Sequence, residues 1–87
     1  MRAIVSVIGK DAKGLIAKVS GALYNAGINI VDITQTIMQE FFTMLMLVEL
    51  DGGDIAPIAK KLEKLGAGLG VEIRIQHEDI FNAMHRI

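Results

Sequence analysis

The stretch "VIGKDAKGLIAKVSGALYNAGINIVDITQT", Val7 to Thr36, runs from one strand-like segment to another through a turn and an amphipathic segment. β-Branched residues ahead of Gly9 predict a strand over Arg2–Ile8. After the turn, apolar residues recur at spacings of three and four, which places them on one face of a helix. Gly27 follows this helix as its predicted left-handed cap. The apolar stripe of the helix consists of Leu15, Ile16, Val19, Leu23 and Ala26.

Two further strand-like segments follow directly. Ile28–Met38 predicts the second strand and Phe41–Leu50 predicts the third. Only Gln39 and Glu40 separate them, so the two strands are expected to form an antiparallel hairpin.

The second half of the chain repeats the order of helix and strand. Asp54 is a good N-cap for a helix whose apolar periodicity covers Ile55–Leu69, with an end expected near Gly66. Val71–Gln76 alternates apolar and polar residues, which predicts a fourth strand with one wet face. A short amphipathic helix is expected at about residues 79–86.

The element order is therefore β-α-β-β-α-β with a tail helix. This order is typical of the ferredoxin-like α+β sandwich. Right-handed crossovers put both main helices on one face of a four-stranded antiparallel sheet. We expect residues 1–87 to form a single domain.

The composition favours an oligomer. The chain has 87 residues, 52% of them hydrophobic, and no cysteine that could form a disulfide. A lone domain of this size is only marginally stable, and oligomerisation is one way to use surplus apolar surface. The segment Phe41–Val48 is apolar on both faces of its strand, whereas two helices cover only one face of the sheet. We expect a homodimer or a higher homo-oligomer; the alternative is a core strand with incidental apolar exposure.

Charge and hydropathy argue against several functional classes. Nine basic and ten acidic side chains give a net charge of −1, which provides no footprint for direct nucleic-acid binding. No apolar run approaches the roughly 20 residues of a membrane span, and the N-terminus lacks a signal-peptide layout. A cytoplasmic protein is expected. No nucleophile is paired with a base at a recognisable spacing, so we expect no enzymatic activity.

The turn between Gly9 and Gly14 has the spacing of a phosphate-binding P-loop but not its chemistry. A P-loop continues with Lys and Ser/Thr, and this chain has Leu15 and Ile16 instead. What remains is a helix N-terminus, whose free N–H groups favour a small carboxylate. Asp11 could meet an ammonium group, so the turn suits an α-amino acid. Alternatively, Asp11 caps the helix and the glycines only permit the turn.

Two other polar groups are candidates for binding. Asn29 stands at the start of the second strand, where its amide could both donate to and accept from a ligand of the same or a partner subunit. It could equally satisfy the local backbone. His77 and His85, with two carboxylates between them, allow a metal-binding hypothesis. They lack the H-E-x-x-H spacing, and charges that complement a helix dipole explain them as well.

The quoted stretch resembles the first half of an ACT domain. The matching residues are Asp11-x-x-Gly14-Leu15-Ile16-Ala17 and Gly27-x-Asn29-Ile30, and the tail HEDIFNAMHRI is similar to stand-alone, uncharacterised ACT proteins. The chain is also similar to the ACT domains of the glycine cleavage transcriptional repressor and of formyltetrahydrofolate deformylase.

The resemblance implies a βαββαβ oligomer that binds an amino acid or similar metabolite at a subunit interface. We expect neither a cofactor nor a metal ion. Because no enzyme is attached, a regulated partner would be a separate protein; the alternative is a ligand-free dimerisation module. Lys13 stands where many family members have proline. The implied ligand-binding residues are Asp11, Lys13, Gly14, Leu15, Ile16, Asn29 and Ile30.

Overall fold

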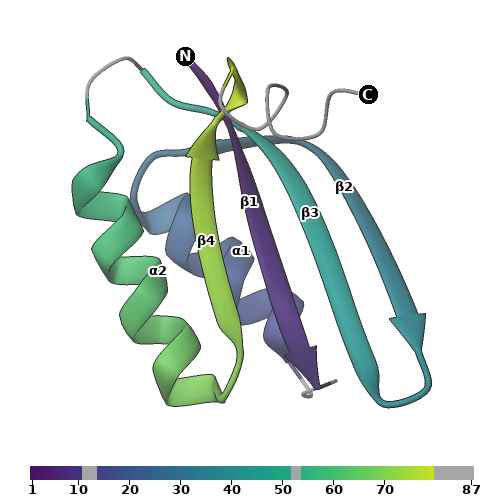
Figure 1. Cartoon of the computed structure of the whole chain (residues 1–87). Coiled ribbons are helices and arrows are strands. Elements are labelled where there is room, and N and C mark those ends of the chain that lie inside the picture. Colours follow the sequence, from purple (N-terminus) through teal and green to yellow (C-terminus); the bar gives the residue numbers. More distant parts are fainter. Residues whose placement is uncertain (11–13, 52–53, 80–87) are drawn as a thin grey trace.

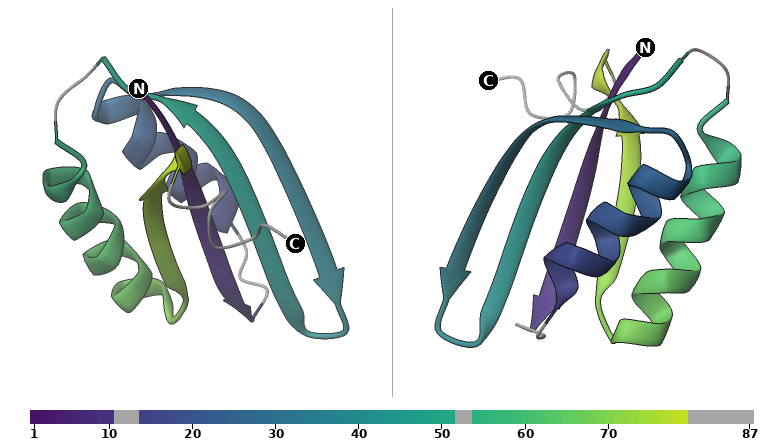
Figure 2. Two further views of the ribbon diagram at one scale, coloured as in Figure 1. Left: turned by 45° about the horizontal axis from the view of Figure 1, so that its top comes forward. Right: turned by 180° about the vertical axis from the view of Figure 1, so that it is seen from behind.

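The computed structural model describes residues 1–10, 14–51 and 54–79. They form one antiparallel sheet of four strands in the order β2-β3-β1-β4. Both helices cover the same face of this sheet (Figures 1 and 2). The ferredoxin-like prediction is therefore confirmed. The elements are β1 (Arg2–Lys10), α1 (Leu15–Asn25), β2 (Asn29–Met38), β3 (Phe41–Glu49), α2 (Ala56–Leu69) and β4 (Glu72–His77).

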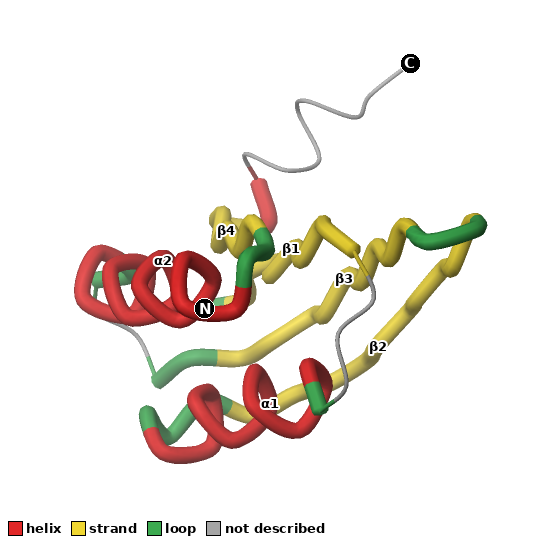
Figure 3. The backbone as a smooth tube through the Cα atoms, turned by 90° about the horizontal axis from the view of Figure 1, so that it is seen from below, coloured by secondary structure: helices red, strands yellow, loops and turns green. Residues whose placement is uncertain are grey.

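The core lies between the sheet and the two helices (Figure 3). Successive strand residues point to opposite faces, and the apolar residues of one parity are buried. On β1, Ala3, Val5 and Val7 have no exposed surface, and the same is true of Leu23 of α1 and Leu62 of α2. The side of the sheet away from the helices is called the open face below. The core residues of β3 are Phe42, Met44, Met46 and Val48.

The end of α1 follows the prediction. Gly27 has a φ of 75° and donates its N–H to the Tyr24 carbonyl at 3.0 Å. Ile28 donates to the Leu23 carbonyl at 2.9 Å. These two bonds make the Schellman motif, which satisfies carbonyls that a helix end leaves free. The chain then enters β2.

The predicted end of the second helix at Gly66 is wrong. The helix continues to Leu69 and ends at Gly70, which has a φ of 73°. Gly66 is a buried helical residue, and a Cβ on it would lie 2.7 Å from the Val71 carbonyl oxygen and 3.1 Å from Cγ1 of Ile73. This glycine allows α2 to approach β4 closely, a role that the local pattern does not distinguish from helix termination.

Smaller differences concern element boundaries. β1 extends two residues beyond the prediction because Lys10 still pairs with Phe41 of β3. α2 begins one residue later than expected, at Ala56, but the Asp54 side chain accepts the Ala56 N–H at 3.0 Å.

The ladder between β2 and β3 shifts register at Val31, which marks a β-bulge. The predicted tail helix lies outside the described residues, except at Asp79.

Candidate functional site

The N-terminus of α1 is the first half of the predicted site. Gly14 occupies the N-cap with a φ of 75°, and no side chain among the described residues caps this helix end. The Lys18 N–H donates to the Gly14 carbonyl at 3.0 Å, which starts the helix. The N–H groups of the first turn therefore have no partner within the helix and carry partial positive charge. Asp11 and Lys13 lie outside the described residues.

Leu15 and Ile16 contribute differently to this helix end. The Leu15 side chain is 2% exposed and belongs to the core. It can offer a ligand only its backbone. The Ile16 side chain is 39% exposed and remains available for apolar contact. We call the segment Gly14–Ile16 the α1 entrance.

Asn29 and Ile30 form the second half of the predicted site, at the opposite end of the sheet. Asn29 pairs with Glu49, which in turn pairs with Arg2 at the start of β1. The α1 entrance follows the other end of β1. Between the two halves lies α1, whose 11 residues span about 16 Å.

The structure thus does not bring Asn29 to the α1 entrance of the same chain. The same-chain alternative for this contact is wrong, because α1 lies between the two positions (Figure 2). Ile30 is partly buried against the core, whereas Asn29 is exposed.

β2 begins at Asn29 and ends at the same end of the sheet as the α1 entrance. β2 is an edge strand ten residues long, and all its residues after Ile30 are exposed. Its one charged residue is Asp32. Long edge strands with few charges and no proline are templates for pairing with another chain. The exposed apolar side chains of β2 are Val31, Ile33, Ile37 and Met38.

This edge is not among the predictions from the sequence, because the expected interface is based on the apolar residues of β3. Much of the apolar surface of β3 is buried, because every second residue of this strand faces the core. The βαββαβ order could have predicted the edge, because this order places the second strand at an edge of the sheet.

Three cavities formed by the described residues leave the two halves of the site separate. A cavity of about 660 Å³ lies between α2 and β4, and one of about 570 Å³ lies where Gly27 and Ile28 meet Asp51, Asp54 and Lys61. A third, of about 160 Å³, opens on the open face. None of the three is lined by the α1 entrance or by Asn29.

The metal-binding hypothesis concerned the end of β4. His77 Nδ1 accepts the backbone N–H of Asp79 at 3.1 Å. Within residues 1–10, 14–51 and 54–79, no three or more His, Asp or Glu side chains are grouped in a way that could hold a metal ion. His85 lies outside these ranges. In the same ranges, no helix is both long and apolar enough to cross a membrane.

The fold and the two half-sites define a ferredoxin-like βαββαβ domain with an open edge strand. The sequence profile of the ACT domain matches residues 2–76, so the chain belongs to the ACT domain family. A UPF0237 protein of Clostridium acetobutylicum is 51% identical over 89 residues, covering 100% of both chains.

Solved structures agree with this assignment. An ACT domain protein from Streptococcus pneumoniae superimposes with a TM-score of 0.85 at 43% identity, covering 98% of each chain. The regulatory subunit of aspartate kinase from Thermus thermophilus has a TM-score of 0.68 at 30% identity, covering 86% of this chain and 50% of that one.

More distant structures share the fold. A putative glycine cleavage system transcriptional repressor has a TM-score of 0.77 at 24% identity, covering 86% of this chain and 44% of that one. A formyltetrahydrofolate deformylase from Burkholderia mallei has a TM-score of 0.78 at 13% identity, covering 87% and 28%. The predicted similarity to both is confirmed.

Proposed function

We propose that this protein is a cytoplasmic, non-catalytic regulatory domain that binds an α-amino acid or a similar small metabolite between two copies of the chain and acts on a separate protein. One observation carries the proposal: the two half-sites lie at opposite ends of the sheet, and β2 is an exposed edge strand that runs from one end to the other. One chain keeps the two half-sites apart, and a symmetric pair of chains would bring them together.

Antiparallel pairing of two β2 strands about a two-fold axis provides the closure. In a two-fold interface, if the first position contacts the second, then the second contacts the first. Asn29 of one copy then lies beside the far end of the other copy's β2. The α1 entrance lies at that same end of the sheet, because Lys10 of β1 pairs with Phe41 at the β2–β3 turn. Each dimer has two such sites.

The chemistry of the combined site suits a zwitterion. The ligand carboxylate would accept N–H groups of Lys13, Gly14, Leu15 and Ile16, at the positive end of the α1 dipole. The Asp11 carboxylate would receive the ammonium group, and the Asn29 amide of the second copy would contact either group.

Relatives support a regulatory role. One structural neighbour is the regulatory subunit of aspartate kinase, and another is named as a transcriptional repressor. This chain matches about half of each of those chains, and the family profile covers most of its length. By analogy, the chain acts as the sensing part and its target is a different polypeptide.

A thermal-shift screen of the amino acids tests the proposal. A ligand at 100 times its dissociation constant adds about 2.7 kcal/mol to stability. Each kcal/mol raises the melting temperature of a domain of this size by roughly 4–8 °C. Asp11→Ala and Asn29→Ala should each abolish the shift. Asp51→Ala serves as a matched control, because Asp51 is an exposed carboxylate outside both half-sites.

The second candidate is a dimerisation module without a ligand. It is favoured by the exposed apolar side chains of β2, which could stabilise a dimer by themselves. A dimer whose melting temperature is unchanged by every amino acid at millimolar concentration would support this candidate and contradict the sensor.

A further inference from the structure

The open face of the sheet carries an apolar strip that the proposed site does not use. Its centre is formed by Ile4 of β1 with Leu45 and Leu47 of β3, all partly buried. Ile4 pairs with Leu47, so these side chains are direct neighbours across the two strands. The third cavity lies here, with Asp32 and Thr34 of β2 completing its lining.

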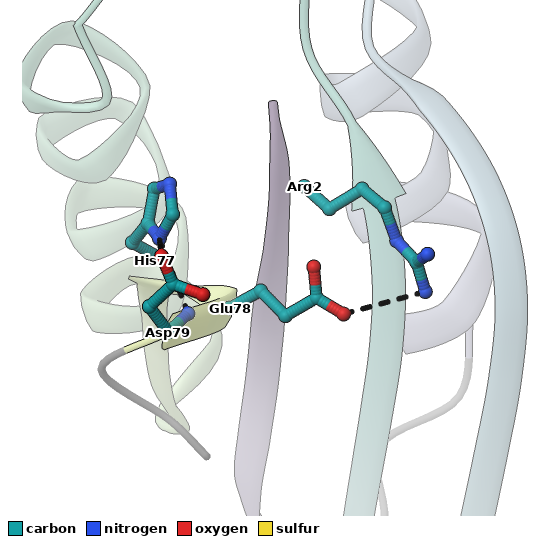
Figure 4. Close-up of polar contacts among 4 residues, drawn as sticks. All are labelled: Arg2, His77, Glu78 and Asp79. Atoms are coloured by element: carbon teal, nitrogen blue, oxygen red, sulfur yellow. Dashed lines mark hydrogen bonds and ion pairs between the residues drawn. The ribbon is translucent and has the colours of Figure 1, made fainter. Parts of the chain in front are cut away.

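The chain leaves β4 in the direction of this strip. Arg2 has the opposite parity to the buried Ala3, so its side chain belongs to the open face. The Glu78 carboxylate lies 3.5 Å from Arg2 Nη2, and its side chain extends across β1 to reach it (Figure 4). The described chain therefore ends, at Asp79, beside the end of the sheet where Ile4 and Leu47 lie.

The eight residues after Asp79 have the length and pattern to cover the strip. Neighbouring strands lie about 4.8 Å apart, so β3 is about 10 Å from β4. Eight residues in a helix span about 12 Å, which is enough to cross β1 and reach β3. In a helix, the apolar residues at positions 80, 81, 84 and 87 would share one face.

The volume of the third cavity and the charge at its rim also suit the segment 80–87. The cavity of about 160 Å³ has room for one apolar side chain and is lined by Ile4, Leu45 and Leu47. The exposed carboxylate of Asp32 stands at its rim. The segment provides His85 and Arg86 one turn or less after Met84.

We propose that the segment 80–87 docks on the open face of its own chain, with Phe81 or Met84 in the cavity beside Leu45 and Leu47. The segment then removes from water an apolar strip that would otherwise be free to associate. Assembly through the β2 edge is left unobstructed, because that edge lies beyond the cavity. This proposal does not depend on ligand binding.

Disulfide trapping tests the proposal, and the absence of cysteine from the chain makes every introduced pair unambiguous. Met84→Cys is combined in turn with Thr34→Cys and with Ser6→Cys, both on the open face. Met84→Cys with Tyr24→Cys is the control, because Tyr24 is 82% exposed on α1, on the other side of the sheet.

Under mild oxidation, at least one open-face pair should close within a single chain, and the control should not. Two results would overturn the proposal: open-face pairs that close no faster than the control, or pairs that close only between chains. The second result would assign the strip to the tail of a second copy.

Dye binding provides an independent measurement. The double variant Phe81→Ser/Met84→Ser should bind more 8-anilinonaphthalene-sulfonate than the wild type and melt at a lower temperature. Tyr24→Ser should change neither property. Dye binding equal to that of the wild type would contradict a docked tail. If the tail does not cover the strip in the wild type, the double substitution exposes no further apolar surface.

Discussion

Gly66 and Gly68 stand two positions apart in α2 and illustrate how differently one residue type can act. A Cβ on Gly66 would lie 2.7 Å from the Val71 carbonyl oxygen, which is backbone and cannot move aside without shifting β4. A Cβ on Gly68 would meet nothing within 4 Å. One glycine sets the distance between helix and strand, whereas the other only weakens the helix.

Alanine substitutions at these two positions should have opposite effects. Gly66→Ala should lower the free energy of unfolding by up to about 2 kcal/mol, because overpacking costs about 1–3 kcal/mol and the helix regains about 1 kcal/mol. Gly68→Ala should raise it by roughly 0.5–1 kcal/mol. Urea denaturation at one fixed protein concentration measures both. Equal changes at the two positions would show that the close contact at Gly66 is unimportant.

At the scale of elements, local patterns predicted the fold because each one agreed with its neighbours. The alternation in β4 and the stripe of α1 both depend on burial against the same core, so pattern and packing coincide. The end of α2 was misplaced because the reason for Gly66 lies in β4, beyond the reach of a local pattern. The separation of Asn29 from the α1 entrance also depends on tertiary structure, because it follows from how α1 packs along the sheet.

The bare edge of β2 gives a prediction about assembly. Ile37 is 58% exposed at the edge strand, so a change there should leave the monomer fold intact. Ile37→Lys places two charges in each symmetric dimer and should weaken dimerisation at least about tenfold, or about 1.4 kcal/mol. Sedimentation equilibrium provides the dissociation constants.

Ala67→Lys is the matched control for this experiment. It adds the same charge at an exposed position on α2, which lies over the opposite edge of the sheet (Figure 1). The control should dimerise like the wild type. If Ile37→Lys also dimerises normally while Ala67→Lys does not, the interface involves α2 and β4 rather than β2.

At the scale of the whole molecule, a site shared between two copies couples binding to assembly. A ligand that contacts the α1 entrance of one copy and Asn29 of the other binds the dimer more tightly than the monomer. By linkage, the ligand must lower the dissociation constant of the dimer by the same factor by which dimerisation lowers the dissociation constant of the ligand. A site built within one chain would show no such coupling. Measurement of the dimer dissociation constant with and without the amino acid found by the screen distinguishes the two cases.

Mixing two inactive variants offers the sharpest test of the shared site. If the proposed site is shared between two copies, Asp11→Ala and Asn29→Ala should each damage both sites of a homodimer. In a heterodimer of the two variants, one site carries both substitutions and the other carries neither. Random exchange at equal concentrations should therefore restore about a quarter of the wild-type sites, which calorimetric titration of the mixture can count. If Asp11 and Asn29 served the same site from one chain, every site in the mixture would remain damaged and no binding would return.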